Sequence, residues 1–285
     1  MRKPILCAGR LYCDMVFADA PRLPTLGTEV FAPNLSLHAG GGAFITGATL
    51  AALGYPVRQF SNLPATPFDT IVLADMAAHD VDATACKPAD NGIDPQITVA
   101  IATAGDRAFL TRAAGQAIPD FSAINFADFA HLHIGELRTL QDSPALLDHA
   151  RAAGLTVSLD CGWQDSYDPD VTALIAAVDV FLPNESEIAA LALLGIPQTC
   201  ARLTVVKSGH KGARARLIDD SAWTNCAVKS PVQVRDATGA GDAFNAGFLS
   251  RWLEHAPLRD CLAKGNACGS AAVQIVGGIG FPQHV

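Results

Sequence analysis

Hydrophobic and polar positions follow different patterns in the two parts of the chain. From about residue 115 onward, short apolar runs of strand length alternate with longer segments in which apolar residues recur every three or four positions. This order is typical of a parallel β-sheet with helices on both faces. It predicts strands at 131–134, 156–159, 178–182 and 203–206, and helices at 145–153, 171–177, 185–194, 240–254 and 258–276.

The first third of the chain has a weaker pattern. Residues 5–9 form a short apolar run that ends in glycine, which suits a first buried strand. Residues 15–38, 96–102 and 108–111 contain short apolar alternations among Pro and Gly, so we expect half-exposed antiparallel strands there. Because no repeat, low-complexity tract or long linker divides the chain, we predict one body with a small β-rich appendage. The predicted body comprises 1–14, 39–94 and 114–285, and the appendage comprises 15–38 and 95–113.

One uncharged stretch, 37–57, is as long as a membrane-spanning helix. Its five glycines and Pro56 favour a tight turn that leads into a buried helix instead. At the amino terminus, Pro4, Arg10 and Asp14 interrupt the apolar run that a signal peptide requires. We therefore expect a mature cytoplasmic N-terminus and no contact with a membrane.

Composition narrows the class of function. The 285 residues are 50% hydrophobic and 17% charged, which is enough apolar material for a large core. A formal net charge of -8 provides no broad cationic field, which argues against a nucleic-acid or anionic-membrane binder. The eight cysteines show no C-x-x-C pair and no zinc spacing, so we interpret them as buried thiols in a reducing cytosol. Small-molecule chemistry is the favoured class.

The most informative motif is Asp236-Ala237-Thr238-Gly239-Ala240-Gly241-Asp242, which an apolar helical run follows at once. A helix that begins here leaves its first amides unpaired, and the glycines allow an anion to approach that backbone. The helix dipole favours the ionised form of Asp242 in the first turn. Such a carboxylate can accept a hydroxyl proton while the amides stabilise a transferring phosphoryl group. Asp242 could instead simply cap the helix, but that role leaves both glycines and Asp236 unexplained.

This motif resembles the C-terminal signature of the ribokinase-like (PfkB) family of carbohydrate and nucleoside kinases, which is close to D-T-T-G-A-G-D-x-F. Six of the seven residues match, and so does Phe244. The resemblance implies that Asp242 is the base that takes the proton from the substrate hydroxyl. It also implies that the amides of Gly239, Ala240 and Gly241 hold the γ-phosphoryl charge, and that a monovalent-cation loop is formed by Asp236, Thr238 and Gly278.

Further motifs follow in the family's order. Asn184 and Glu187 match the N-x-x-E element, whose residues act through Mg²⁺ and its waters on the nucleotide phosphates, although this spacing also fits an ordinary capping box. Residues 207–212 look like the G-x-x-G nucleotide loop, or a simple turn. Asn266 matches a position near the adenine, which an exposed helical Asn would explain equally well. The residues that the resemblance assigns to ATP are Asn184, Lys207, Gly209, Gly212 and Asn266.

Two further matches to the family indicate which residues bind the substrate. Asp14 ends a G-x-x-x-x-D element whose Asp binds substrate hydroxyls, and a carboxylate can accept two such hydrogen bonds from a polyol. Gly41 and Gly42 belong to a second glycine signature, but Ile45 stands where the family usually has a sugar-contacting Asn. Arg107 could reach an anionic substituent of the substrate, or could equally be a solvated hairpin arginine.

The resemblance covers residues 9 to 280. It implies a ribokinase-like three-layer α/β/α body with a mostly parallel central sheet and a small β-sheet lid. It implies ATP-dependent phosphorylation of a hydroxyl on a sugar, sugar derivative or nucleoside, with Mg²⁺ and K⁺ as the candidate cations. A lid over the site would exclude water, and its strand edges could be covered by a second subunit in a homodimer.

Two other classes of function stay open. Ile45 favours a catalytically inactive nucleotide- or sugar-binding regulator. A dinucleotide-dependent oxidoreductase would share the alternation of strands and helices, but no acceptable glycine fingerprint follows the first strand. Phe244 also occupies the third glycine position of such a fingerprint.

Overall fold

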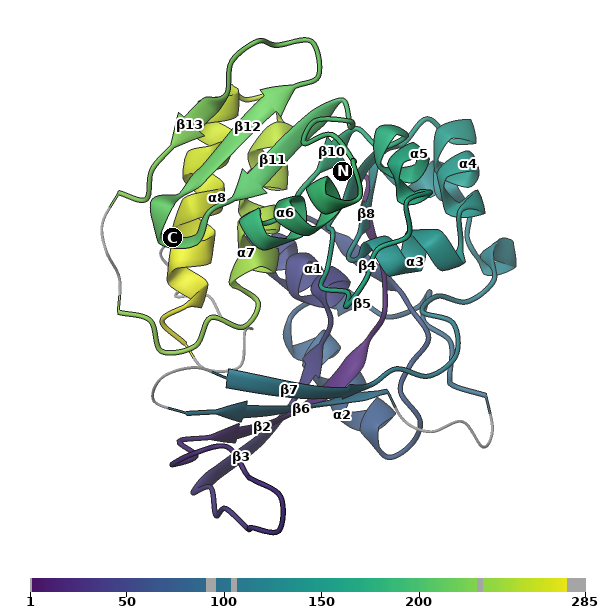
Figure 1. Ribbon diagram of the computed structural model, residues 1–285. Coiled ribbons are helices and arrows are strands. Elements are labelled where there is room, and N and C mark those ends of the chain that lie inside the picture. The colour runs from purple at the N-terminus through teal and green to yellow at the C-terminus, as the bar shows by residue number, and fades with distance from the viewer. Residues whose placement is uncertain (1, 91–95, 104–106, 230–232, 276–285) are drawn as a thin grey trace.

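The computed structural model describes residues 2–90, 96–103, 107–229 and 233–275, which form a large sheet between two helix layers and a smaller sheet beside it (Figure 1). The large sheet is parallel from β5 to β11, and its last two strands are antiparallel. Its strand order is β13 (Thr224–Cys226), β12 (Ala213–Leu217), β11 (Leu203–Lys207), β10 (Val180–Phe181), β9 (Thr156–Leu159), β8 (His131–Ile134), β1 (Ile5–Ala8), β4 (Val57–Phe60), β5 (Val81–Asp82).

Helices cover both faces of the large sheet because its central strands are apolar and buried on both sides. The side chains of four helices pack on one face: α1 (Gly42–Ala52), α2 (Phe68–Ala78), α7 (Ala240–Trp252) and α8 (Leu258–Ala272). The other face is covered by α3 (Leu137–Asp142), α4 (Ala145–Ala152), α5 (Val171–Ala176) and α6 (Glu185–Leu193). The predicted three-layer α/β/α body is confirmed.

The uncharged stretch from 37 to 57 folds into the end of a strand, a glycine turn and the buried helix α1, as the glycines indicated. Across the described part of the chain, we find no helix with the length and apolarity needed to cross a membrane.

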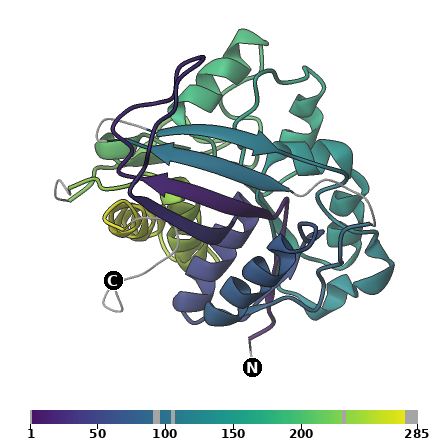
Figure 2. The ribbon, with the colours of Figure 1, turned by 90° about the horizontal axis from the view of Figure 1, so that it is seen from below.

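The small sheet has four strands in the order β3 (Asn34–Gly40), β2 (Tyr12–Ala18), β6 (Ile97–Ala102), β7 (Arg107–Arg112), which Figure 2 shows side by side. We refer to it as the lid sheet. Its outer pairs are antiparallel, but β2 and β6 run parallel, with Asp14 opposite Thr98. The expectation of purely antiparallel strands was therefore wrong for the central pair. Both β2 and β6 leave the body at the same edge, so they extend in the same direction.

The boundaries of the lid sheet also differ from the predicted ones. Strand β2 begins at Tyr12 and β3 continues to Gly40. Asp14 and Gly40 therefore lie in the lid sheet and not in the body. Alternating apolar and polar positions mark a strand but do not mark where it passes from one sheet to another.

Arg10 fastens the lid sheet to the body. Its side chain is 8% exposed, and its guanidinium donates to Gln96 Oε1 at 2.5 Å and to the carbonyls of Ala114 and Gly115 at 2.8 Å each. These three acceptors lie just before β6 and just after β7, while Arg10 itself precedes β2. One buried cation thus ties together three of the chain segments that connect the two sheets.

We expect Arg10→Met to loosen this connection. One hydrogen bond to a charged group contributes about 1.5–3 kcal/mol, and the three bonds of Arg10 share one side chain and are not additive, so the free energy of unfolding should fall by at least about 2 kcal/mol. Hydrogen exchange at 97–102 and 107–112 should accelerate, whereas the exposed Arg112→Met should change stability by about 0.5 kcal/mol or less. Equal exchange in the two variants would contradict the role given to Arg10.

Candidate active site

The two carboxylates singled out from the sequence lie beside one glycine turn. A Cβ built on Gly40 would be 2.0 Å from Asp14 Oδ2, and a Cβ built on Gly42 would be 2.9 Å from Asp242 Oδ1. At Gly42 the Gly135 carbonyl oxygen, also 2.9 Å from that Cβ, is backbone and leaves no room for a side chain, whereas a side chain at Gly40 would displace the Asp14 carboxylate. The Asp14 carboxylate therefore lies beside the first residue, and the Asp242 carboxylate beside the last residue, of the tripeptide 40–42, which joins the lid sheet to the amino end of α1.

Gly41, between them, has a φ of +109°, and its Cβ would meet the Arg10 carbonyl oxygen at 2.2 Å. Only glycine adopts this conformation in this space without strain. The turn therefore presses the amino end of α1 against the loop that follows β1. This edge, where the parallel strands end, is the usual position of ligand sites in open α/β sheets.

The motif at 236–242 forms a second turn at the same edge. Gly239 has a φ of +69° and precedes α7, and in the part of the chain that the structure describes no side chain caps this helix. Asp236 Oδ1 accepts hydrogen bonds from the backbone N–H of Thr238 at 2.8 Å and from its hydroxyl at 2.7 Å. Asp242 therefore does not cap its own helix. The Ala240 N–H donates to the Ala237 carbonyl at 3.3 Å, whereas the amides of Gly239 and Gly241 have no hydrogen-bond partner among the described residues and stay available to a ligand.

A buried ion pair, Lys207 with Asp160, lies next to this turn. Lys207 Nζ, at the end of β11, donates to Asp160 Oδ1 and Oδ2 at 3.0 and 2.8 Å and to Asn245 Oδ1 at 3.2 Å. Asn245, one turn along α7 from Asp242, also donates to Asp160. Strand β9, strand β11 and α7 are thus joined through one ammonium group, which lies 3.5 Å from where a Cβ of Gly241 would be.

The expected role of Lys207 as a direct nucleotide ligand stays a prediction, and its contacts with the protein indicate a role through charge. Its three N–H donors face Asp160 and Asn245, which places its positive charge beside the turn that carries Gly241. Asp160 and Asn245 were missed from the sequence. Two signals could have found them: Asp160 directly follows a buried strand, and Asn245 lies three residues after Asp242 on an otherwise apolar helix.

Negative charge exceeds positive charge around the ion pair. Desolvation and then the Asp160 charge raise the pKa of Asp242 well above its usual range, although part of its surface is exposed, and Lys207 opposes the shift. The same causes raise the pKa of Glu187 to about 7. Burial acts to lower the pKa of Lys207, but Asp160 and Glu187 raise it above its ordinary value. A ligand that brings a cation would relieve this excess.

The residues assigned to ATP have protein partners of their own. Asn184 and Glu187 form a full capping box on α6: Glu187 N donates to Asn184 Oδ1 at 2.9 Å, and Asn184 N donates to Glu187 Oε2 at 2.8 Å. Gly209 opens a short 3₁₀ turn before β12, so this segment is also the simple turn that the sequence allowed.

Gly212 and Asn266 meet at the carbonyl of Cys226. A Cβ on Gly212 would lie 2.1 Å from that oxygen, and Asn266 Nδ2 donates to it at 2.9 Å. Asn266 is only 8% exposed, so the alternative of an exposed helical Asn was wrong. The hydrogen bond from Asn266 joins α8 to β13, and the missing side chain of Gly212 lets β13 lie close to the start of β12.

On the substrate side, Asp14 faces Thr98 across the lid sheet, and burial raises its pKa to about 6 although a hydrogen bond from Thr98 opposes the shift. Arg107 is not a solvated hairpin arginine. Its guanidinium lies 3.9 Å from Asp236 Oδ1 and 5.3 Å from the centre of the Phe109 ring, so it spans from β7 to the loop before α7. Ile45 is buried in α1 at 5% exposure.

The predicted cation loop is only partly described. Asp236 and Thr238 form the turn given above, whereas Gly278 lies outside the described residues. Within residues 2–90, 96–103, 107–229 and 233–275, no three His, Cys, Asp or Glu residues are grouped as metal ligands.

We expect Lys207→Met to destabilise the protein strongly. Removing one partner of a buried ion pair costs about 3–5 kcal/mol, because Asp160 would be left buried without its counter-ion. Chemical denaturation should show this loss, and adding Asp160→Asn should recover part of it. Lys211→Met, at an exposed position four residues along the chain, serves as the control and should change the free energy of unfolding by about 0.5 kcal/mol or less. A Lys207→Met variant as stable as this control would contradict the account of the ion pair.

Known proteins similar to this chain are kinases of small molecules. Over 275 residues it is 27% identical to an ATP-dependent ribose-1-phosphate kinase from Halopiger xanaduensis, covering 93% of this chain and 90% of that protein. It is 28% identical over 275 residues to a fructokinase from Rhizobium leguminosarum bv. trifolii, covering 86% and 78%.

Solved structures share the whole fold. A putative ribokinase from Agrobacterium tumefaciens superposes with a TM-score of 0.83 at 19% identity, covering 99% of this chain and 95% of the other. Arabidopsis thaliana ribokinase complexed with ribose and ATP gives 0.78 at 20% identity, covering 98% and 95%. The pfkB carbohydrate kinase family matches residues 6–284, nearly the full length. The chain therefore belongs to the pfkB family of carbohydrate kinases.

Proposed function

We propose that the protein transfers the γ-phosphoryl group of ATP to a hydroxyl group of a sugar, sugar derivative or nucleoside. The observation that carries the proposal is the position of the Asp242 carboxylate, beside uncapped helix amides and across one glycine turn from Asp14. The names of its relatives support the same class, since they include an ATP-dependent ribose-1-phosphate kinase and a fructokinase.

In the proposed reaction, Asp14 accepts hydrogen bonds from substrate hydroxyls and orients the acceptor toward Asp242. The acceptor oxygen attacks the γ-phosphorus, its proton passes to the Asp242 carboxylate, and the bond between the γ-phosphorus and the bridging oxygen of ADP breaks. The amides of Gly239, Ala240 and Gly241 stabilise the charge on the transferring group. The lid sheet, held by Arg10, keeps water away from the reacting atoms.

The acidic surroundings fit Mg²⁺ on the nucleotide. Mg²⁺ keeps several waters and binds one or two carboxylates together with phosphates, so Glu187 and Asn184 would hold it through water at the end of β10. When bound, Mg²⁺ neutralises phosphate charge.

We assign K⁺ to the loop of Asp236 and Thr238. The Asp236 carboxylate oxygen Oδ1 also lies 3.9 Å from the Arg107 guanidinium.

We also propose that two copies pair through the lid sheet in a reducing, cytoplasmic compartment. Large apolar side chains of this region are exposed: Leu26, Phe31, Leu35, Phe109 and Leu110. An apolar surface of this kind marks an interaction site. All eight cysteines are free thiols, which suits a reducing environment.

A coupled assay of ADP release tests the function and the substrate class together. The panel comprises pentoses, ketohexoses, sugar acids, ribose 1-phosphate and nucleosides, each with Mg²⁺ and with or without K⁺. Substrate-dependent ADP release is the expected result. ATP binding without turnover on any member would instead favour the catalytically inactive regulator.

Asp242→Asn should slow phosphoryl transfer severely while leaving ATP affinity largely unchanged. General-base catalysis contributes about 10²–10⁴-fold, so kcat should fall by about that factor. Asp260→Asn is the matched control, since Asp260 also lies in the first turn of a helix but at an exposed position. Its kcat should equal that of the unmodified protein. Full activity of Asp242→Asn would remove Asp242 from the mechanism.

The pH dependence of kcat/KM should report Asp14. Its raised pKa, about 6, means that the free protein carries a protonated Asp14 below that pH and an ionised one above it. The ionised carboxylate accepts substrate hydroxyl protons better, so kcat/KM should fall about tenfold per pH unit below about pH 6. Asp14→Asn should give a lower profile that lacks the limb with a midpoint near pH 6 and keeps only the acidic limb of the base Asp242, whose pKa is also raised. If the limb persists with the same midpoint, another group is responsible for it.

A further inference from the structure

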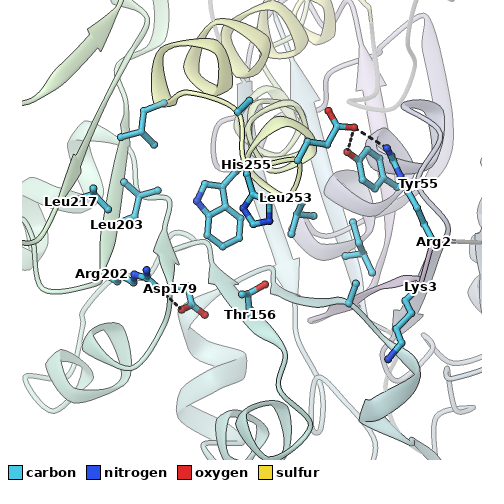
Figure 3. Close-up of a pocket in the computed structure, with 16 residues that line it drawn as sticks. Arg2, Lys3, Tyr55, Thr156, Asp179, Arg202, Leu203, Leu217, Leu253 and His255 are labelled. Atoms are coloured by element: carbon cyan, nitrogen blue, oxygen red, sulfur yellow. Dashed lines mark hydrogen bonds and ion pairs between the residues drawn. The ribbon is translucent and has the colours of Figure 1, made fainter.

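A cavity of about 740 Å³ opens at the amino ends of the strands, at the opposite edge of the large sheet from the candidate active site (Figure 3). It lies between the starts of β1, β9 and β11 and the carboxyl end of α7. Cavities of this volume hold small organic molecules. We refer to it as the amino-edge cavity.

Apolar and aromatic side chains form most of its inner surface. They come from the sheet, from the segment after α1 and from the end of α7: Ile5, Tyr55, Leu203, Leu217, Trp252 and Leu253. A flat, apolar ring system matches such a surface, because it can pack against the half-buried Trp252 ring and the aliphatic side chains and bury its own area; the Tyr55 ring is already covered by Arg2.

Both acidic side chains of the cavity are already paired with arginines. Glu254 accepts a hydrogen bond from Arg2 at 3.0 Å. Asp179 accepts one from Arg151 at 2.8 Å and is itself largely buried. Neither carboxylate therefore leaves negative charge for a ligand to neutralise.

Two further cations lie at the rim, on opposite sides of Thr156 (Figure 3). Lys3 Nζ donates to the neutral carbonyl of Ala127 at 2.7 Å, and no carboxylate among the described residues pairs with it. Arg202 has a 77% exposed side chain and lies 4.0 Å from the already paired Asp179. Lys3 and Arg202 therefore give the border of the cavity a positive charge, which favours an anion.

Thr156 begins a hydrogen-bond chain that runs under α7 along the sheet. Its Oγ1 is 2.7 Å from His131 Nδ1, His131 Nε2 is 2.8 Å from Ser158 Oγ, and Ser158 Oγ is 2.9 Å from His133 Nδ1. All but Thr156 are fully buried. Trp252 of the cavity also packs on this chain, with its ring centre 5.8 Å from that of His131.

The chain reaches the candidate active site. Burial lowers the pKa of His131 to about 3 and that of His133 to about 4, so both rings are neutral at pH 7. The charges of Asp160 and Lys207 act on His133. Among the described residues, His133 Nε2 has no hydrogen-bond partner.

Neutral imidazoles give this chain two complete arrangements of its protons. In the first, Thr156 donates to His131, His131 to Ser158 and Ser158 to His133, and His133 Nε2 carries a buried N–H without a partner. In the second, every bond is reversed, His133 Nε2 presents a lone pair, and the Thr156 hydroxyl proton is free to point into the cavity. An anion that accepts this proton selects the second arrangement and so changes the dipole beside Lys207 and Asp160.

We propose that the amino-edge cavity is an effector site for a small aromatic anion, and that the chain Thr156–His131–Ser158–His133 couples its occupancy to nucleotide binding at the opposite edge of the sheet. The coupling rests on the proposed function, whereas binding in the cavity does not.

Calorimetry with 2-naphthoate as the probe tests the site. The uncharged 2-naphthylmethanol and the ringless acetate should each bind at least about tenfold more weakly, since each lacks one of the two matched features. Ala256→Trp, which fills the cavity, should abolish binding, and Arg202→Gln should weaken it about fivefold. Arg138→Gln, on the exposed side of α3, is the control and should leave binding unchanged. No binding of 2-naphthoate, or binding that survives Ala256→Trp in a folded variant, would overturn the site.

The coupling is tested by measuring the dissociation constant of a non-hydrolysable ATP analogue with and without saturating 2-naphthoate. We expect a change of about fivefold, and the analogue should change the affinity for 2-naphthoate by the same factor. Ser158→Ala interrupts the chain, so it should leave the affinity for 2-naphthoate nearly unaltered and abolish the coupling. Ser250→Ala, at another buried serine, should retain it. Unchanged coupling in Ser158→Ala would overturn the role of the chain, and failure of the analogue to bind at all would count against the proposed function while leaving the cavity result intact.

Discussion

The buried contact between Lys207 and Asp160 is the interaction on which the site most depends. A single ammonium group joins the ends of β9 and β11 to Asn245 of α7, directly beneath the turn that carries Gly241 and Asp242. Buried ion pairs often add little net stability, because desolvation offsets their attraction. In this protein the ion pair instead determines where neighbouring elements lie. The pair fixes where α7 begins, and it partly offsets the carboxylates around it.

The glycine turns impose the second constraint. Asp14 and Asp242 are more than two hundred residues apart in the sequence, yet each lies where a side chain on Gly40 or Gly42 would otherwise be. The site thus exists only when the lid sheet, the start of α1 and the start of α7 are all in place. Arg10 contributes to this by binding the chain segments between body and lid. Lid position and site geometry are therefore set by the same few contacts.

Much of the fold could be predicted from the sequence because parallel strands buried on both faces leave continuous apolar runs, and the helices between them keep their own periodicity. The motif at 236–242 likewise located the uncapped start of α7. The direction of β6 relative to β2 could not be predicted, because an alternating pattern is the same whichever way a strand runs. The partners of Lys207 and the burial of Asn266 depend on which elements pack together, and single motifs carry no such information.

The central claim is that the amides at the start of α7 and the Asp242 carboxylate face one phosphoryl group. A crystal structure with ADP, Mg²⁺, aluminium fluoride and an accepted sugar measures this directly. We predict the planar fluoride within hydrogen-bond distance of the amides of Gly239 to Gly241, and the acceptor hydroxyl between it and Asp242. A fluoride bound elsewhere, or an acceptor hydroxyl out of reach of Asp242, would contradict the account.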